Sequence, residues 1–404
     1  MAAPSIAKNR RLGITGNPDY DGTPFTDFAS VTSATRVEDL NLNWRERDLP
    51  ERERTKHVHR LHPYLGKFVP QLVEIFLRKY KPATVIDPFC GSGTTLIEAS
   101  TLGTASIGCD ISEFNCLLTQ VKLGEYDLDL LEREINDILM RLHLELRPTL
   151  FSNGRSKQLR ASSEYLQTWL APKALSQLLF YRSLIPDYTY QDVLRIVLSR
   201  AARSARLTTH FDLDFPKKPQ TEPYECYKHR RTCHPTDEAE KFLVRYSLDT
   251  LRRIKEFAQI RAKATAQVIC GDSREVAFPP ADMIITSPPY VGLIDYHEQH
   301  RYAYELLGLQ TRENEEIGPA SGGSSRAAVG RYVDDLTDAF RNAMHALKPG
   351  GRMVVVVHDR RNLYEEIRGR LRVEVEHRLE RHVNRRTGRR SGDFFESVIV
   401  WRKH

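Results

Sequence analysis

Short apolar runs of strand length mark the first ordered part of the chain. Residues 83–87 form one such run and residues 105–109 form a second, with a helical repeat of apolar positions between them. This pattern predicts a compact βαβ unit over residues 83–110. A helix is expected ahead of it, over residues 63–80, with apolar side chains at Phe68, Leu72, Ile75 and Phe76.

A long interval of helical repeats then interrupts this alternation. The expected helices cover residues 128–146, 172–184, 191–206 and 237–259. A piece rich in proline, histidine and arginine, over residues 208–235, separates the last two. We therefore expect residues 126–262 to form a mostly helical insertion.

Strand-like runs return in the last third of the chain. They cover residues 267–270, 283–286, 353–357, 372–376 and 394–401. The last two runs would pair as a closing hairpin, and the glycine- and serine-rich stretch 318–330 is expected to be a mobile loop. The whole pattern predicts an α/β fold with a doubly wound, Rossmann-like sheet of about seven strands that ends in antiparallel strands.

Four regions follow from this pattern. They are an irregular N-terminal arm (1–55), the first half of the α/β domain (56–125), the helical insertion (126–262) and the second half of the domain (263–404).

Charge and composition narrow the class of protein. The chain has 404 residues and a formal net charge of +7, which favours an acidic partner such as a phosphate backbone. Its six cysteines are far apart, as is typical of reduced thiols rather than a disulfide framework. No apolar run approaches the ~20 residues of a membrane span, and the N-terminus lacks a signal pattern. We expect a cytoplasmic protein with no membrane partner.

The turn after the first strand is the first candidate site. From Asp87 to Thr95 it reads Asp-Pro-Phe-Cys-Gly-Ser-Gly-Thr-Thr. Its glycines allow a tight turn and close approach of a ligand, and the N–H groups of the following helix favour a carboxylate or a phosphate. Asp110, at the end of the second strand, is suited to accept hydrogen bonds from ribose hydroxyls. Each feature alone is also common in ordinary turns, whereas the pair indicates a ligand site.

A second motif, Ser287-Pro288-Pro289-Tyr290, follows the run over residues 283–286. Two prolines cannot continue a central strand, and they fix a rigid backbone at its end. A serine hydroxyl and a proline carbonyl both accept hydrogen bonds, and a tyrosine ring offers a stacking surface. An amino group on a flat base needs this combination. The alternative is a proline-rich loop with a structural tyrosine.

Together these two motifs resemble those of the amino-methylating DNA methyltransferases, which act on N4 of cytosine or N6 of adenine. The segment from His62 to Pro70 is similar to the motif that precedes the glycine loop in that family. The resemblance covers most of residues 60–125 and 266–401. It implies the fold expected above, S-adenosylmethionine as cofactor, and cofactor and catalytic roles for the first and second halves of the domain.

The resemblance also implies roles for individual residues. Catalytic roles fall on Ser287, Pro288, Pro289 and Tyr290. Cofactor contacts fall on Tyr64, Lys67, Asp87, Phe89, Gly91, Gly93, Thr94, Asp110 and Asp272. Within that set Asp110 would hold the ribose, and Asp272 or its neighbour Ser273 would lie near the adenine. The insertion is the candidate for target recognition by elimination, although it precedes the Asp272 strand and recognition segments in the family usually follow it.

The expected reaction is direct methyl transfer to the exocyclic amine of a base flipped out of double-stranded DNA. In the family a serine at the first motif position is associated with N4 of cytosine, and an aspartate is commoner in N6-adenine enzymes. Methylation of adenine N6, of an RNA amino group, or a non-catalytic regulatory role are the alternatives. Methylation of cytosine C5 would need a cysteine nucleophile, usually after a proline, and the chain has no Pro-Cys pair.

Basic and metal-like clusters complete the survey. DNA phosphate contacts are expected from Arg203, Arg206, Arg385, Arg386, Arg389 and Arg390. Arg200, Arg203 and Arg206 share one helical face and can equally form internal ion pairs. Cys226 and Cys233 have a spacing that is not usual for zinc, so no metal site is expected. No nuclease motif is present, which leaves a separate restriction endonuclease, as in a restriction-modification system, as a possible partner.

Overall fold

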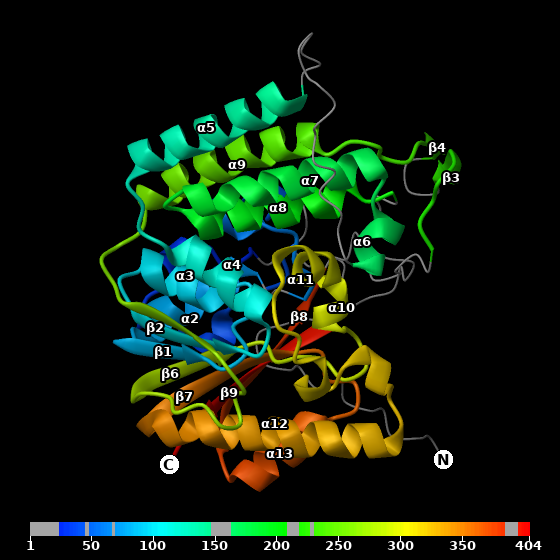
Figure 1. Ribbon diagram of the computed structural model, residues 1–404. Coiled ribbons are helices and arrows are strands. Elements are labelled where there is room, and N and C mark those ends of the chain that lie inside the picture. The colour runs from blue at the N-terminus through cyan, green and yellow to red at the C-terminus, as the bar shows by residue number, and fades with distance from the viewer. Residues whose placement is uncertain are drawn as a thin grey trace.

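The computed structural model describes residues 24–44, 48–66, 69–146, 163–207, 218–226, 230–383 and 395–404. Its central feature is a seven-stranded sheet in the order β5-β2-β1-β6-β7-β9-β8 (Figure 1). The strands are β1 Thr84–Asp87, β2 Ala105–Asp110, β5 Ala266–Cys270, β6 Ala281–Thr286, β7 Leu347–Val357, β8 Glu374–His382 and β9 Phe395–Arg402. The predicted seven-stranded α/β fold is confirmed.

The order in which strands are added to the sheet changes direction at β1: β2 and β5 lie on one side of it, and β6 and β7 lie on the other. β1 pairs in parallel with β2 on one side, where Val85 lies opposite Ser106, and with β6 on the other, where Val85 lies opposite Met283. β5 and β7 extend the parallel set, whereas β9 runs antiparallel to both β7 and β8. In open parallel sheets, ligands bind beyond the carboxyl ends of the strands at such a switch point.

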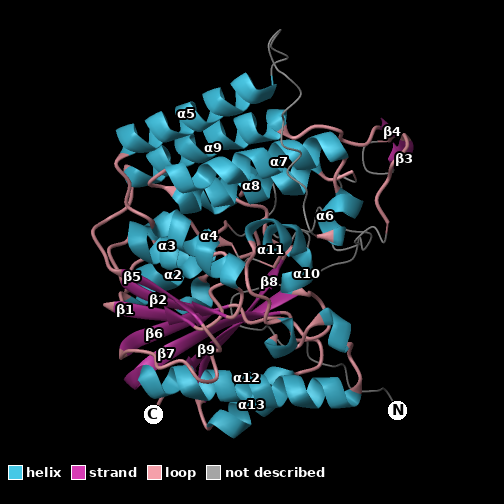
Figure 2. Ribbon diagram, in the orientation of Figure 1, coloured by secondary structure: helices cyan, strands magenta, loops and turns pink. Residues whose placement is uncertain are grey.

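Helices cover both faces of the sheet (Figure 2). One face carries α2 Pro70–Tyr80, α3 Thr94–Thr101 and α4 Glu113–Leu123, and the other carries α12 Arg326–Ala346 and α13 Leu363–Leu371. Successive strand residues point to opposite faces. Val85 therefore packs with Phe76 of α2, and its neighbour Ile86 packs with Phe340 of α12. Both faces are apolar, as is expected of a parallel sheet buried between two layers.

The interval 126–262 forms a helical bundle that stacks on the α3 and α4 layer (Figure 1). Its helices are α5 Leu128–Leu146, α6 Glu164–Trp169, α7 Pro172–Leu184, α8 Gln191–Ala205 and α9 Glu240–Ala258. Phe114 and Leu118 of α4 share one core with Leu194 and Val197 of α8. The interval also holds a two-stranded ribbon, β3 Tyr224–Cys226 and β4 Arg231–Cys233, which the sequence did not predict.

Smaller elements connect these layers. They are α1 Glu51–Arg54, α10 Tyr296–Gln299, α11 Arg301–Leu307, and the 3₁₀ turns η1 Phe28–Ser30, η2 Val37–Asp39, η3 His57–Arg60, η4 Ile185–Asp187, η5 Glu313–Glu315 and η6 Ala320–Gly322. Within the described part of the N-terminal arm, Leu40 and Leu42 are buried in the same core as Val354 and Val400 of the sheet. No helix among the described residues has the length and apolarity needed to cross a membrane.

Two expectations about element boundaries are wrong. The helix expected over residues 63–80 begins only at Pro70, because proline fits the first turn of a helix and Gly66 has a left-handed backbone with φ of +83°. The stretch expected as a loop over residues 318–330 is helical from Arg326 onward, where the Ser325 hydroxyl accepts a hydrogen bond from the Ala328 N–H and caps α12.

Candidate active site

A pocket with about 760 Å³ of empty space lies at the carboxyl edge of the parallel strands. The loops that follow β1, β2, β5 and β6 all contribute to it. Its lining residues are Tyr64, Gly66, Phe89, Cys90, Gly91, Ser92, Thr94, Asp110, Ile111, Asn115, Asp272, Ser273, Ser287, Pro289, Tyr296, Glu315, Glu316 and Ile317.

The glycine loop forms one wall of the pocket. Gly91 and Gly93 have φ values of +50° and +81°, a left-handed conformation that side chains disfavour. A Cβ atom at Gly91 would lie 2.7 Å from the Tyr64 hydroxyl, and one at Gly93 would lie 2.6 Å from Thr119 Cγ2. The Thr119 hydroxyl donates to the Gly91 carbonyl at 3.0 Å. The loop therefore has both a conformation and a close packing that require glycine.

Asp87 is fully buried and fixes the loop from beneath. Its carboxylate accepts hydrogen bonds from the hydroxyls of Thr95 and Thr286, each at 2.7 Å, and from the Phe89 N–H at 3.1 Å. These bonds join the glycine loop to the end of β6, where Ser287 begins the second motif. Burial raises the pKa of Asp87 to about 6, and the three donors oppose that shift. Asp87 is not among the lining residues, so its part in the site is to hold the two loops together.

Asp110 lines the pocket at the end of β2. One carboxylate oxygen, Oδ1, accepts from the Ser112 N–H at 2.9 Å and the Asn115 amide at 3.0 Å. The other, Oδ2, accepts from the Gly91 N–H at 2.8 Å. A carboxylate oxygen has two lone pairs, so Oδ2 retains capacity for a ligand hydroxyl. Burial raises the pKa of Asp110, and these donors work against the rise.

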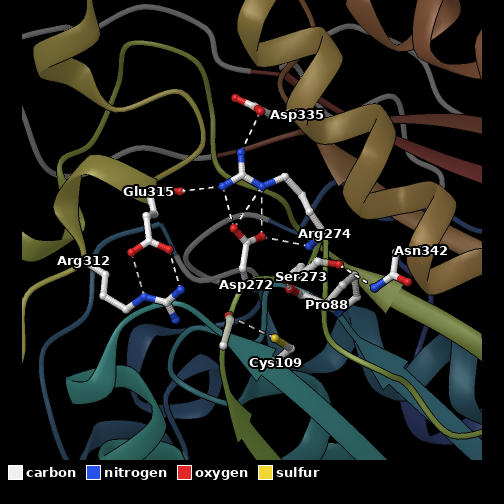
Figure 3. Close-up of polar contacts among 10 residues, drawn as sticks. Pro88, Cys109, Asp272, Ser273, Arg274, Arg312, Glu315, Asp335 and Asn342 are labelled. Carbon is white, nitrogen blue, oxygen red and sulfur yellow. Dashed lines mark hydrogen bonds and ion pairs between the residues drawn. The ribbon is translucent and has the colours of Figure 1, made fainter.

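Asp272 follows β5 and is held by an arginine (Figure 3). Arg274 donates to its carboxylate from the backbone N–H at 2.9 Å and from Nε at 3.0 Å. Arg274 also reaches Asp335 of α12 at 2.6 Å and the Glu315 carbonyl at 3.4 Å. Burial pushes the pKa of Asp272 upward, but the hydrogen bonds from Arg274 outweigh it and the pKa is lowered. Arg274 thus ties the Asp272 side of the pocket to the loop that carries Glu315.

Ser273 connects the same wall to the glycine loop. Its hydroxyl donates to the Pro88 carbonyl, and its own carbonyl accepts from the Asn342 amide of α12 at 3.0 Å (Figure 3). The Ser273 side chain is therefore engaged within the protein, although the residue lines the pocket.

The second motif closes the pocket at the end of β6. Ser287 and Pro289 line the cavity, and Pro288 between them is buried. The Tyr332 hydroxyl of α12 donates to the Pro289 carbonyl at 2.9 Å. This bond and the two prolines hold the backbone of the motif in one conformation.

Tyr290 completes the motif but is not among the lining residues. Its ring centroid lies 6.5 Å from that of His358, which follows β7. Burial raises its pKa well above the usual range, while a polar contact with Ser287 acts in the opposite direction. Tyr290 and Ser287 are therefore neighbours, and the ring is beside the pocket that Ser287 lines.

Aromatic rings and buried polar groups form another part of the pocket wall. Tyr64 stacks between Tyr296 and His300, with centroid distances of 5.9 Å and 5.7 Å. His297 pairs with Glu316, which also lines the pocket. His300 and His297 are both buried.

The predicted site residues fall into three groups. Those that the structure brings together at the pocket are Tyr64, Phe89, Gly91, Thr94, Asp110, Asp272, Ser287, Pro289 and their supports Asp87, Gly93, Pro288 and Tyr290. Lys67, Arg385, Arg386, Arg389 and Arg390 lie outside the described residues. Arg203 and Arg206 lie at the end of α8 and are not among the lining residues.

Arg206 is a correction to the DNA-contact prediction. It is 1% exposed, its guanidinium lies 4.6 Å from the centre of the Tyr302 ring, and it donates to the Tyr165 hydroxyl at 3.5 Å. A guanidinium enclosed in this way does not reach a phosphate. On the same helix face, Arg200 forms an internal ion pair with Asp249 at 2.7 Å, which is the alternative that the sequence had left open.

Some lining residues were not predicted. Asn115 joins Asp110 to the Tyr64 hydroxyl, and Tyr296 stacks on Tyr64. Asn115 lies in the first turn of α4, five residues after Asp110, and a polar side chain at that spacing is the sequence signal for it. Tyr296 begins the four-residue helix α10 and Glu316 follows η5, and elements this short offer no periodic signal in the sequence.

Comparison with known proteins places this site in a family. A family model described as DNA methylase, with a name that joins N6 and N4 methyltransferases, matches residues 31–121. The Type II methyltransferase M.MjaII of Methanocaldococcus jannaschii is 36% identical over an alignment of 430 positions. The alignment covers 87% of this chain and 81% of that protein.

Two further relatives are more distant or shorter matches. The Type II methyltransferase M.BsoBI of Geobacillus stearothermophilus is 25% identical over 75% of this chain and 65% of its own length. A tRNA (guanine(10)-N2)-dimethyltransferase of Methanocaldococcus jannaschii is 36% identical over 90 residues, 22% of this chain and 25% of that protein. The extent of the first match decides the assignment: the chain belongs to the family of amino-methylating Type II DNA methyltransferases.

Proposed function

We propose that this protein transfers a methyl group from S-adenosylmethionine to the exocyclic N4 amino group of cytosine in double-stranded DNA. One observation supports this proposal above all others. Ser287 and Pro289, from the motif after β6, line the same cavity as Gly91 and Asp110. An amine held at Ser287 would therefore lie next to a ligand held by the glycine loop.

The residues present fit the methyl donor. Asp110 Oδ2 has capacity for a ribose hydroxyl, and the left-handed glycines pack so closely against Tyr64 and Thr119 that no other residue type fits the loop. The first turn of α3, which begins at Thr94, offers backbone N–H groups suited to the carboxylate of an amino acid. Ser273 and Asp272 would bound the adenine. S-adenosylmethionine, when bound, supplies an activated methyl group on a sulfonium sulfur.

The protein's own contribution is to orient and activate the amine. The amine of a base is a poor nucleophile because its lone pair is conjugated into the ring. Hydrogen bonds from its N–H groups to the Ser287 hydroxyl and the Pro288 carbonyl would draw the nitrogen toward tetrahedral geometry and stabilise the positive charge that develops on it. Tyr290 would stack on the flipped base. The remaining rate enhancement comes from positioning.

Serine at position 287 is the reason to choose cytosine. In the family this residue type is associated with N4 of cytosine, as stated above, and an aspartate with N6 of adenine. The matched family model covers both activities and so leaves the choice of base to this residue. N6 of adenine is the second candidate, with the same fold, cofactor and mechanism.

The DNA partner and its recognition belong to the same proposal. The helical bundle is the candidate for target recognition, since it is the large element outside the sheet and its two helical layers. A cognate restriction endonuclease, encoded separately, would explain protective methylation. Candidates for phosphate contacts remain Arg203, Arg385, Arg386, Arg389 and Arg390.

Nucleoside mass spectrometry tests the function directly. The chain would be expressed in a host without DNA methylation, and its DNA and RNA would be hydrolysed and analysed separately. N4-methylcytosine in DNA supports the proposal, and N6-methyladenine would transfer it to the second candidate. A new mark in RNA alone would favour the activity named for the short tRNA relative, and no new mark in either would contradict the proposal.

A further inference from the structure

Away from the pocket, two histidines and a glutamate meet in the interior. His57 and His59 belong to η3, and Glu98 belongs to α3. They are 7%, 0% and 0% exposed. One ligand atom from each residue can be chosen so that all three lie within 4.8 Å of one another. Buried titratable groups are costly unless they are paired, so a cluster of three needs a physical reason.

His57 is the residue of this cluster whose two ring nitrogens lack hydrogen-bond partners among the described residues. Its backbone is left-handed, with φ of +35°, which is uncommon for a residue other than glycine. The Phe257 ring stacks on it at 5.1 Å, and Arg253 donates to its carbonyl at 3.2 Å. The ring is thus held firmly in place by contacts that use none of its polar atoms.

We propose that His57, His59 and Glu98 bind a divalent transition-metal ion of the zinc type. Two imidazole nitrogens and one carboxylate oxygen form a common three-residue ligand set for such ions, with water in the fourth position. The ion would give the lone pair of His57 the partner that it lacks. Nothing in the expected chemistry of methyl transfer uses these residues, so the ion would be structural.

Binding requires the three side chains to rearrange, because ligand atoms that lie within 4.8 Å of one another must enter one coordination shell. His59 Nε2 now lies 2.7 Å from Glu98 Oε1, which is a hydrogen-bond distance. Two ligand atoms on one tetrahedral zinc ion, with bonds of about 2.0–2.2 Å, lie about 3.3 Å apart. The His59 and Glu98 side chains would therefore separate by a few tenths of an ångström. His59 would bind as the neutral tautomer that carries its proton on Nδ1, which leaves the Nε2 lone pair for the ion.

Lys56 is the internal competitor of the ion. Its Nζ lies 3.1 Å from Glu98 Oε2 and 3.5 Å from Glu74 Oε2. The ammonium would be repelled by a divalent cation, but its side chain is 30% exposed and Glu74 offers an alternative partner. Removing the positive charge of Lys56 should therefore strengthen metal binding. This expectation distinguishes a metal site from a cluster held together by the lysine.

The position of the proposed metal site, between η3 and α3, indicates a structural role. η3 packs against α9 of the helical bundle, through the stack of His57 on Phe257. Glu98 lies on α3, the helix that starts directly after the glycine loop. An ion held by η3 and α3 would fix η3, on which α9 of the bundle packs, to the helix that follows the glycine loop, without touching the ligand pocket.

Calorimetric titration of zinc into the metal-free full-length protein tests the site. We expect about one ion per chain at micromolar affinity or tighter, together with a higher melting temperature. His57→Phe keeps the stack on Phe257 and removes both nitrogens, and should weaken binding at least about tenfold. His345→Phe, on an exposed histidine of α12, is the matched control and should bind zinc as wild type does.

Two further variants keep the proposal falsifiable if His57→Phe folds poorly. Lys56→Gln should bind zinc more tightly than wild type, and weaker binding would overturn the proposal. A Cys226→Ser, Cys233→Ser double variant should bind zinc normally. Loss of binding in that double variant would place the ion at the β3–β4 ribbon instead, and absence of any zinc-dependent rise in melting temperature for wild type would also overturn the proposal.

Discussion

At the scale of single residues, the hydroxyl of Ser287 can be removed with little change of shape. Ser287→Ala should lower the rate constant for methyl transfer about 10- to 100-fold, because the hydroxyl would accept a hydrogen bond that strengthens as charge develops on the amine. Affinity for S-adenosylmethionine should change less than about twofold, since the glycine loop and Asp110 are untouched. Single-turnover methylation and calorimetry measure the two quantities.

A matched variant separates this effect from general loss of structure. Ser33→Ala replaces an exposed serine in the N-terminal arm and should methylate as wild type does. Equal rates for Ser287→Ala and Ser33→Ala would mean that the second motif does not hold the amine, and the site assignment would then be wrong.

Residue-level prediction from the sequence succeeded where chemistry and strand ends coincide. Asp110 and Ser287 each follow an apolar run directly, so their place at the carboxyl edge of a parallel sheet could be inferred. Arg206 shows the limit: three arginines at helical spacing look like a basic face, yet Arg206 is enclosed by Tyr165 and Tyr302. Which face of a helix is buried depends on partners that lie far away in the sequence.

At the scale of elements, the glycine loop is fixed by its packing against α4. Gly93→Ala would place a methyl group 2.6 Å from Thr119 Cγ2 in a left-handed backbone with φ of +81°. The strain and the clash together should lower the free energy of unfolding by about 2–4 kcal/mol and weaken cofactor binding. Chemical denaturation and calorimetry measure these effects.

Gly308→Ala is the control for backbone conformation alone. Gly308 ends α11 with φ of +69°, and a Cβ there would meet no atom within 4 Å. That variant should lose only about 1 kcal/mol and bind the cofactor normally. If both alanine variants lose the same stability and the same affinity, close packing of the loop on Thr119 has no part in the site.

Element boundaries were predictable when a local signal marked them. The runs that became β1 and β2, and the repeat that became α7, were identified to within about two residues because turns bound them. The β3–β4 ribbon was missed since its strands have three residues each and lack any alternating apolar pattern. The order of strands in the sheet could not be derived either, because pairing joins β1 to β6 across almost two hundred residues.

At the scale of the whole molecule, the sequence identified the layers but not the contacts between them. The insertion was recognisable as helical, whereas its packing on α4, through the core that Phe114 and Leu194 share, could not be predicted from the sequence. The same is true of the cluster of His57, His59 and Glu98. Residues about 40 positions apart carry no spacing signal for a metal site, and only the stacking of η3 between α3 and α9 brings them together.

DNA binding through the net charge of the whole chain and DNA binding through one basic segment would respond differently to salt and to substitution. The chain carries a formal net charge of +7, and Arg385, Arg386, Arg389 and Arg390 concentrate part of it in one segment. If these four contact phosphates, replacing them with glutamine should reduce the slope of log affinity against log salt by about 3–4, because each phosphate contact contributes about 0.9. Affinity for the cofactor should be unchanged.

The control removes the same total charge elsewhere. Arg331, Arg341, Arg368 and Arg370 lie on α12 and α13, which cover the other face of the sheet from the bundle (Figure 2). Replacing these four with glutamine should leave the salt slope within about one unit of wild type, since a field from distant charges is screened beyond about 10 Å in 0.1 M salt. Fluorescence anisotropy with a labelled duplex, at several salt concentrations, measures both slopes. Equal losses in the two variants would mean that DNA responds to the overall charge of the molecule and not to the basic segment, and recognition would then have to come from the bundle.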